Sequence, residues 1–233
     1  MAFLTLTPFE IEALLLSLKV SLWAVLISLA PGILAAWLLA RKKFFGKAFF
    51  DSLIHLPLVL PPVVTGYFLL VLLGKKGVVG SFIFKLTGLS FAFNWKGAAL
   101  ASGVMAFPLF VRAVRLSLEA VDLGLEDAAR TLGASRLYIF FTITLPLILP
   151  GILTGMILAF ARSLSEFGAT ITFVSNIPGE TRTLPLALYT MTQVPDGESG
   201  AMRLCIISVV TAFFALMAAD FLSQRLSKMV KGD

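Results

Sequence analysis

Side chains able to support catalysis are few in this chain of 233 residues. Its one histidine, His55, and its one cysteine, Cys205, cannot form an H-E-x-x-H zinc site, a thiolate–metal cluster or an intrachain disulfide. The sequence also lacks a G-x-x-x-x-G-K-[ST] phosphate loop, so ATP hydrolysis by the usual P-loop route is excluded. Asp51 and Asp220 are the nearest candidates for an acidic pair, and they lie at the ends of apolar runs. We therefore expect a protein that is not an enzyme and that holds no metal or cofactor.

One pair of opposite charges lies within an apolar stretch. Arg162 and Glu166 are four residues apart, on the same face of a helix, and we expect them to pair because a lone charge in a bilayer is costly. The alternative is that Arg162 attracts an anion. Nearby hydroxyls could donate to an oxyanion, although hydroxyls also bond to their own helix backbone: Ser163, Ser165, Thr170 and Thr172. His55 is expected to be a structural hydrogen-bonding residue.

The composition indicates which elements must position these residues. The chain is 58% hydrophobic and 14% charged, with a mean hydropathy of +0.96, far from the values of a soluble domain. A helix needs about 20 apolar residues to cross a bilayer, and these runs do not alternate as barrel strands do. The predicted fold class is an all-α polytopic membrane protein with one domain, 1–233. Five transmembrane helices are expected, at about 14–39, 53–73, 98–114, 143–173 and 202–222.

The basic residues are shared unequally between the two sides of these spans. Eleven of the 19 fall in one set of loops and in the tail: Arg41, Lys42, Lys43, Lys47, Arg112, Arg115, Arg130, Arg136, Arg225, Lys228 and Lys231. The positive-inside rule assigns that set to the cytoplasm. This predicts a protein of the bacterial cytoplasmic (inner) membrane, with the N-terminus outside and the C-terminus in the cytoplasm. The formal charge of +6 is thereby assigned to topology and not to nucleic acid binding.

The predicted cytoplasmic loop 117–142 carries signals for two helices. Asp122 can cap a first helix through Leu132, because its carboxylate accepts from free N–H groups of the first turn. Gly133 can take the left-handed conformation that ends a helix, and Ser135 can cap a second helix toward Pro146. The result is a helix–Gly–helix elbow (residues 122–146). Docking on another protein is one interpretation, and a linker helix lying on lipid head groups is the other. The first helix gathers small and apolar residues on one face: Leu125, Ala128, Ala129 and Leu132.

The elbow sequence EDAARTLGASRLYIFFTITLP (126–146) resembles the EAA loop of ABC-importer permeases. The spacing of 127–129, Gly133, Ile143 and 145–146 matches that loop, with Asp127 in place of the family's Glu. Segments 55–74, 113–136 and 161–190 are similar to molybdate importer permeases. The resemblance implies a MetI-like type I permease fold and a coupling helix that binds a cytoplasmic ATPase. The coupling residues that it implies are Glu126, Asp127, Ala128, Ala129 and Gly133.

Two proline-containing segments repeat one another. LPLVLPPVVTG (56–66) and LPLILPGILTG (145–155) agree at seven of eleven positions, and both enter the membrane from the same predicted side, as parallel repeats do. Prolines free backbone carbonyls, which are tolerated at membrane depth where they pack on protein or line a cavity. We expect spans 2 and 4 to line a translocation path, and the alternative is simple kinking. The expected path residues are Pro61, Pro62, Thr65, Pro150, Thr154, Arg162, Ser165 and Glu166.

Taken over the chain, the resemblance implies the permease subunit of an ATP-driven importer that translocates molybdate and also tungstate. Its partners would be two cytoplasmic ABC ATPase subunits, a second copy of the chain in a homodimer, and the lipid bilayer. A periplasmic or surface oxyanion-binding protein would contact loops 75–96 and 181–200. Two alternatives stay open. A sulfate or thiosulfate importer permease is built similarly, and an ion-coupled carrier would need mid-membrane charges, for which only Arg162 and Glu166 qualify.

Overall fold

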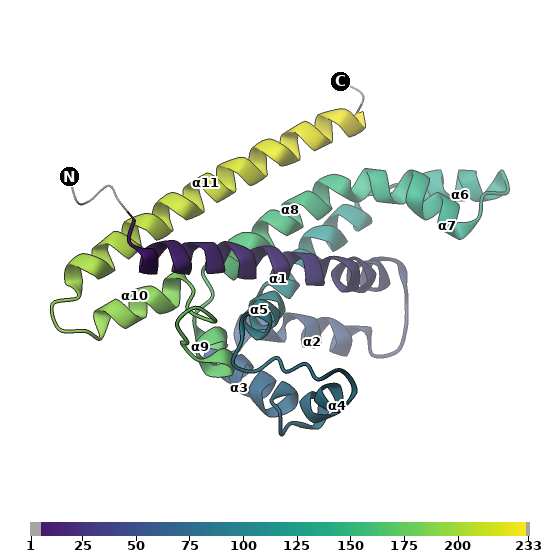
Figure 1. Ribbon diagram of the computed structural model, residues 1–233. Helices are drawn as coiled ribbons and strands as arrows, with labels where there is room; N and C mark the ends of the chain where they lie inside the picture. Colours follow the sequence, from purple (N-terminus) through teal and green to yellow (C-terminus); the bar gives the residue numbers. More distant parts are fainter. Residues whose placement is uncertain (1–5, 232–233) are drawn as a thin grey trace.

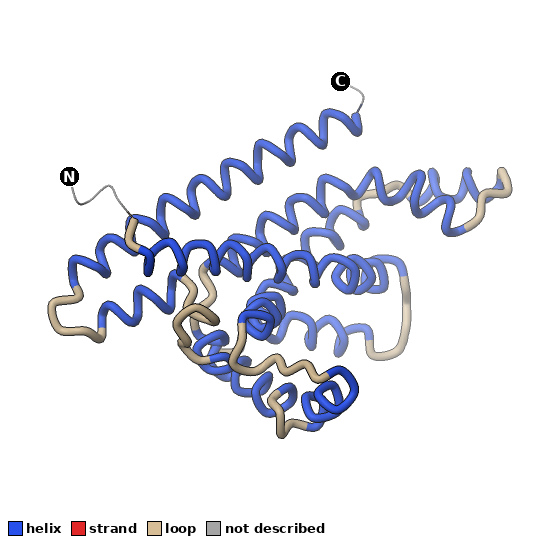
Figure 2. Tube along the Cα trace, viewed as in Figure 1, coloured by secondary structure: helices blue, strands red, loops and turns tan. Residues whose placement is uncertain are grey.

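The computed structural model describes residues 6–231, with side chains through Phe221 and at Gln224. These residues form helices and loops without a strand (Figure 2), which confirms the all-α class. Three basic side chains used in the topology prediction, those of Arg225, Lys228 and Lys231, lie outside the described ones.

The first helix, α1, runs from Pro8 to Arg41. It begins with a capping box, in which the Glu10 N–H donates to the Thr7 hydroxyl at 3.3 Å and the Thr7 N–H donates to the Glu10 carboxylate at 2.7 Å. Pro8 occupies a first-turn position, where its missing N–H costs nothing. Pro31 lies inside the helix without ending it. The helix contains the whole of the predicted span 14–39.

The core lies where α1, α5 (Trp95–Glu119) and α8 (Leu145–Leu164) pack together. Phe110 of α5 is fully buried between two glycines. A Cβ at Gly32 of α1 would lie 2.4 Å from the Phe110 ring, and one at Gly155 of α8 would lie 2.9 Å from it. A Cβ at Gly151 would likewise lie 2.2 Å from the Ser117 side chain. Glycine at these positions therefore lets α1 and α8 approach α5 closely.

The segment predicted as a single span, 53–73, differs from that prediction because it consists of two helices. These are α2 (Lys47–Val59) and α3 (Pro62–Leu73), and they are bent by 115°. Pro61 and Pro62 explain the break, since Pro62 lacks the N–H that would continue the ladder and disfavours a helical residue before it. Leu60 and Pro61 are accordingly extended, with ψ of 143° and 131°.

The predicted span 143–173 is also interrupted. Helix α8 ends at Leu164, and α9 (Gly168–Val174) follows after a short turn. Helix α9 packs on α3. A Cβ at Gly66 of α3 would lie 2.5 Å from the Ala169 carbonyl oxygen, and one at Gly168 would lie 2.8 Å from the Pro62 side chain. The two interrupted segments therefore meet backbone to backbone.

Three further helices lie outside the elbow: α4 (Val78–Thr87), α10 (Leu184–Thr192) and α11 (Glu198–Lys231). Helices α4 and α10 fall in loops to which no helix was assigned. Helix α11 follows the edge of the molecule (Figure 1) and is tied to α1 by Arg203, whose guanidinium donates to both carboxylate oxygens of Glu10 at 2.8 and 2.9 Å.

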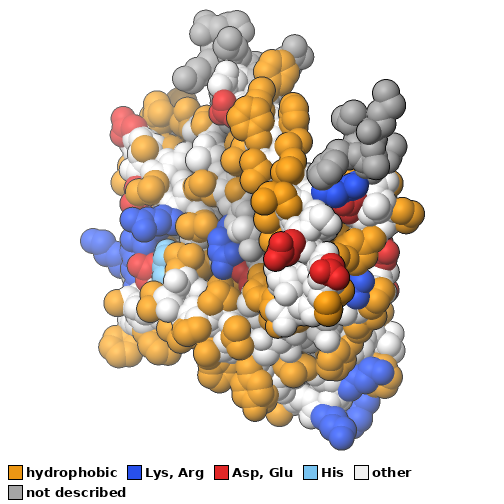
Figure 3. Space-filling model, turned by 90° about the vertical axis from the view of Figure 1, so that its left-hand side faces the viewer, with side chains coloured by type: hydrophobic (Ala, Val, Ile, Leu, Met, Phe, Trp, Pro, Cys, Tyr) orange, Lys and Arg blue, Asp and Glu red, His pale blue; other side chains and the backbone are white. Residues whose placement is uncertain are grey.

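Four described helices or helical runs are long and apolar enough to cross a membrane, and the bent pair α2–α3 makes a fifth if it counts as one span. Much of the surface is hydrophobic, as a bilayer requires. Figure 3 shows hydrophobic side chains spread over one face, with the charged side chains gathered in a few separate groups. Exposed large apolar residues include Leu15, Leu22, Val209, Phe213 and Phe214.

Candidate functional site

The elbow begins with α6 (Leu123–Thr131), which confirms the helix expected between 122 and 132. The Asp122 carboxylate caps it by accepting from the Gly124 N–H at 2.8 Å. Gly133 follows the helix with φ of +86° and has no neighbouring atom within 4 Å of a Cβ placed on it. The backbone, and not crowding, therefore requires glycine here. The Ala134 N–H closes the turn by donating to the Ala129 carbonyl at 3.1 Å.

The second arm of the elbow runs from α7 (Arg136–Ile139) through a π-helical turn, η1 (Phe140–Thr144), into α8. The Ser135 hydroxyl caps it by accepting from the Tyr138 N–H at 3.3 Å, as the sequence predicted. The π turn was not predicted. A π turn has one residue more than an α turn and is frequent at functional sites. Figure 1 shows α6 and α7 projecting together from one end of the molecule.

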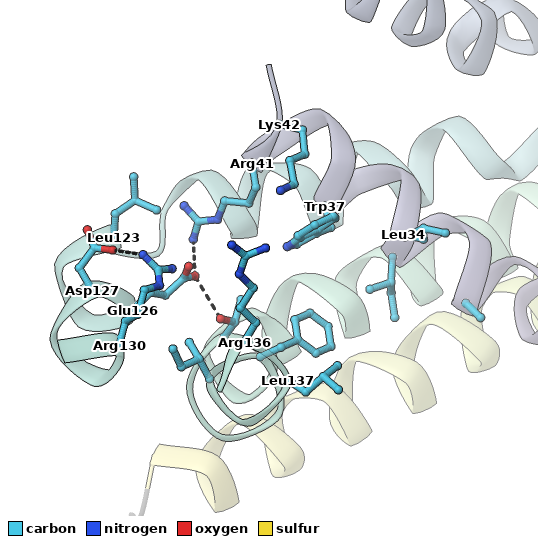
Figure 4. A pocket seen from close by; sticks show the side chains of 15 residues that line it. Leu34, Trp37, Arg41, Lys42, Leu123, Glu126, Asp127, Arg130, Arg136 and Leu137 are labelled. Atoms are coloured by element: carbon cyan, nitrogen blue, oxygen red, sulfur yellow. Dashed lines mark hydrogen bonds and ion pairs between the residues drawn. The ribbon is translucent and has the colours of Figure 1, made fainter. Parts of the chain in front are cut away.

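Glu126 of α6 faces inward and joins three elements. Its carboxylate accepts from the Arg41 guanidinium at 2.9 Å and from the Thr144 hydroxyl at 3.0 Å. The Arg41 and Glu126 side chains are 12% and 15% exposed. Glu126 is one of the residues expected to couple the chain to an ATPase, and its contacts connect α6 to the end of α1 and to the end of η1, immediately before α8. Figure 4 shows this bridge.

The other expected coupling residues lie at the surface of the elbow. Asp127 is exposed and pairs with Arg130 at 2.6 Å, Ala128 is exposed, and Ala129 is half-buried. Large apolar side chains surround them without a covering element among the described residues: Leu123, Leu125, Leu132 and Leu137. The exposed fraction reaches 88% at Leu132. An apolar surface of this kind on a protruding helix fits a protein partner.

The predicted pair Arg162–Glu166 is present at the break between α8 and α9. The Arg162 guanidinium lies 2.7 Å from one Glu166 oxygen, and the Ala169 N–H donates to the other at 2.7 Å. Glu166 is buried, and its carboxylate is therefore satisfied on both sides. Ser165 donates to the Arg162 carbonyl at 3.1 Å and is exposed.

The remaining path candidates lie in different surroundings. Thr65 is buried, and its hydroxyl has no hydrogen-bond partner among the described residues, whereas the equivalent Thr154 is exposed and donates to the Pro150 carbonyl at 2.9 Å. Pro61 is exposed and Pro62 is half-buried against α9. The structure thus does not bring the two halves of the sequence repeat into equivalent positions.

Like Ser165, two of the other hydroxyls considered for an oxyanion bond to their own backbone. Thr170 donates to the Phe167 carbonyl at 2.8 Å, and Thr172 donates to the Gly168 carbonyl at 2.9 Å. Ser163 donates across helices to the Ser102 carbonyl at 3.3 Å. Within the described residues, no group of three or more His, Cys, Asp or Glu side chains could hold a metal.

His55 has the structural role that the sequence predicted. Its Nδ1 lies 2.9 Å from the Asp51 carbonyl oxygen and 3.2 Å from the Asp51 carboxylate. Asp51 also accepts from Arg115 of α5 at 3.0 Å, so it fastens α2 to α5. Sequence reasoning missed this contact and the bridge from Arg41 to Glu126. Arg41 looked like one of four basic residues after the first span, and only its position at the helix end set it apart.

This geometry defines the class of protein: a helical membrane protein with a protruding elbow between two packed helices, α5 and α8. The family model for the inner membrane component of binding-protein-dependent transport systems matches residues 32–228. The chain belongs to this family.

Relatives with high sequence identity are named as molybdenum transport proteins. The molybdenum transport system permease protein ModB of Escherichia coli K12 is 63% identical over 219 residues, covering 94% of this chain and 96% of the relative. ModB of Haemophilus influenzae is 57% identical with the same coverage. The sulfate transport system permease protein CysW of Synechocystis is 37% identical, covering 92% of this chain and 77% of the relative.

Solved structures share the fold. A bacterial ABC transporter that imports the acidic polysaccharide alginate aligns with a TM-score of 0.74 at 19% identity, covering 96% of this chain and 82% of that chain. The inward-facing MetNI methionine ABC transporter aligns with a TM-score of 0.66 at 16% identity, covering 94% of both chains. The expected type I importer permease fold is confirmed.

Proposed function

We propose that the chain is the membrane-spanning permease subunit of an importer that carries molybdate, and also tungstate, across the bacterial cytoplasmic membrane. It hydrolyses no ATP itself. An ATPase subunit docks on α6, and two such subunits act on a homodimer of this chain. The observation that carries the proposal is the elbow, whose outer face is apolar and exposed while its inner face is bonded to α1 and α8 through Glu126.

The contacts of Glu126 give a route for an ATP-driven movement. A displacement of α6 pulls on Arg41 at the end of α1 and on Thr144 immediately before α8. A hydrogen bond to a charged group contributes about 1.5–3 kcal/mol, and both side chains of the ion pair are largely shielded from water. The three elements therefore move together more readily than they separate.

The two interrupted segments support a path beside α3 and α9. Broken helices at membrane depth are tolerated where they pack on protein or line a water-filled cavity, and transporter sites are built from such helices. Helix α8 connects the elbow to this region in one continuous run of twenty residues. A shift at Thr144 would thus reach Glu166 and the α3–α9 contact.

Two observations argue against an ion-coupled carrier. Arg162 and Glu166, the charges that the sequence singled out for coupling, neutralise each other at 2.7 Å. The second carboxylate oxygen of Glu166 also has a donor. A carrier of this kind needs a mid-membrane group that gains and loses its ion, and this carboxylate has little freedom to do so.

Molybdate is favoured over sulfate by the relatives. The ModB proteins reach 63% and 57% identity, while the sulfate permease CysW reaches 37%. In the proposed arrangement the elbow and the C-terminus are cytoplasmic and the N-terminus is outside. An oxyanion-binding protein delivers the substrate to the outer loops 75–96 and 181–200.

The proposal is tested by uptake of radiolabelled molybdate in a strain that lacks this chain, with and without the chain restored on a plasmid. We expect the plasmid to restore uptake. Unlabelled tungstate should suppress this uptake, whereas an equal concentration of sulfate should not. Molybdate uptake that does not change on deletion would overturn the proposal. Loss of sulfate uptake in its place would select the sulfate alternative.

A further inference from the structure

A groove lies between the C-terminal part of α1, helix α6 and the α7–η1 segment, with a volume of about 780 Å³. Figure 4 shows its side chains converging from α1 on one wall and from the elbow on the other. The lining residues include Leu34, Trp37, Lys42, Arg136 and Phe140. The coupling contact of Arg41, Glu126 and Thr144 lines part of this groove, but it gives no role to the other lining residues.

The groove is apolar at one end and basic at the other. Along α1 its wall runs from Ala30 through Ile33 and Leu34 to Trp37 and then to Lys42. The seven steps from Ala30 to Trp37 span about 10 Å at 1.5 Å per residue, and one leaflet of a hydrocarbon core is about 15 Å thick. The apolar wall therefore covers about two thirds of the length of an acyl chain, and the basic residues follow it at head-group depth.

At the basic end of the groove the acidic side chains are paired, whereas two of the cations are not. Both acids that line the groove are already paired, Glu126 with Arg41 and Asp127 with Arg130. Lys42 lies 5.0 Å over the Trp37 ring and makes no ion pair with any described residue. Arg136 makes no ion pair with any described residue, and Figure 4 shows its side chain directed across the groove toward Trp37. Lys42 and Arg136 thus face each other as cations without a carboxylate between them.

We propose that this groove binds an anionic phospholipid of the cytoplasmic leaflet. The phosphate lies between Lys42 and Arg136, the head group rests against Trp37, and one acyl chain follows Leu34 and Ile33. Basic pockets between membrane helices bind anionic head groups, and tryptophan is favoured at this depth. A bound lipid would hold the end of α1 against the elbow, beside the Arg41–Glu126 pair.

An anionic lipid fits this site better than a protein does. Of the exposed leucines suited to a docked ATPase, Leu125 and Leu132 lie outside the groove. Leu123 and Leu137 line it from the elbow, whereas the opposite wall is part of the apolar helix α1. A zwitterionic lipid would bring its own cation next to Lys42 and Arg136, and like charges repel. The inference requires α1 to be in the membrane but does not depend on the identity of the transported anion.

The test uses the full-length chain purified in detergent and exchanged into nanodiscs that contain equal amounts of phosphatidylglycerol and phosphatidylcholine. Retained lipid is counted by native mass spectrometry after transfer back to detergent. We expect phosphatidylglycerol on the unmodified chain and a loss of about 30-fold in its relative retention in the double variant Lys42→Gln, Arg136→Gln. Two surface cations contribute about 1 kcal/mol each, and 1.4 kcal/mol is a factor of ten.

The matched control is Lys43→Gln, Lys47→Gln, which removes the same amount of charge at two positions close to Lys42 that do not line the groove. It should retain phosphatidylglycerol like the unmodified chain. Equal loss in both double variants, or equal retention of the two lipids by the unmodified chain, would overturn the inference. So would an assembled complex in which an ATPase subunit fills the groove and no phospholipid is retained.

A second measurement does not alter the basic residues. In a Trp23→Phe, Trp95→Phe background, Trp37 is the remaining tryptophan of the three in the chain. Brominated phosphatidylglycerol should quench its fluorescence at lower concentration than brominated phosphatidylcholine. Equal quenching by the two lipids would contradict the inference, and both readouts are independent of molybdate uptake.

Discussion

Arg41 and Glu126 are 85 residues apart in the sequence, and their side chains form an ion pair of 2.9 Å that joins the end of α1 to the elbow. Glu126 also accepts from Thr144, the residue immediately before α8. A single carboxylate thereby connects the docking helix to two helices of the core. In the proposed mechanism, this connection carries the movement of the ATPase into the membrane.

Glu126→Gln should destabilise the protein by about 1–3 kcal/mol, because a largely buried charged hydrogen-bond partner is lost and Arg41 is left unpaired. Thermal unfolding in detergent measures the change. Asp127→Asn is the matched control, since its ion pair with Arg130 is exposed and such pairs contribute less than about 1 kcal/mol. Equal destabilisation by the two changes would contradict the assigned role of Glu126.

Gly133→Val should leave the protein inserted in the membrane but prevent ATPase binding. A side chain at a φ of +86° costs about 1–2 kcal/mol and reshapes the turn between α6 and α7. Gly88→Val is the control, because Gly88 also has a positive φ of 70° and no neighbour within 4 Å but lies outside the elbow. The measurement is copurification of the ATPase with each variant. Normal copurification with Gly133→Val would remove Gly133 from the coupling role.

Gly66→Ala should destabilise the fold by about 1–3 kcal/mol through overpacking, because its Cβ would meet the Ala169 carbonyl oxygen at 2.5 Å. Gly103→Ala in α5 provides the comparison, since its nearest neighbour would lie at 3.4 Å. Thermal unfolding of the two variants checks the contact between α3 and α9. If both substitutions are equally tolerated, the interrupted segments do not pack as tightly as described.

Thr154→Cys should react with a water-soluble thiol reagent in the assembled transporter, at a rate that changes with bound nucleotide, because Thr154 is exposed on a helix assigned to the path. The background is Cys205→Ser, since Cys205 is also exposed. Phe213→Cys on the apolar face of α11 should stay unreactive in lipid. A lack of reaction at position 154 in every nucleotide state would exclude it from the path.

The sequence predicted elements whose signals are local. Asp122, Gly133 and Ser135 set the limits of the elbow through caps that act within a few residues. Arg162 and Glu166 are four residues apart, so their pairing is also a local feature. Apolar runs of sufficient length located α1, α5 and α11.

Features that depend on long-range packing could not be predicted in this way. Hydropathy counts apolar residues but contains no information on the direction of a helix axis. The bend of 115° between α2 and α3 could therefore not be predicted from it. Proline alone is an ambiguous signal, because Pro31 and Pro108 lie inside continuous helices while Pro61 and Pro62 mark a break. The partner of Glu126 was equally hidden, since nothing local links the end of the first helix to the elbow.

Copurification with the ATPase tests the central claim most directly. The comparison is between the unmodified chain, Ala128→Arg on the exposed surface of α6, and Gln193→Arg at an exposed position outside the elbow. We predict that the Ala128→Arg variant loses the ATPase, whereas the Gln193→Arg variant and the unmodified chain retain it. Full retention of the ATPase by a folded Ala128→Arg variant, with unchanged ATP-driven molybdate uptake, would contradict it.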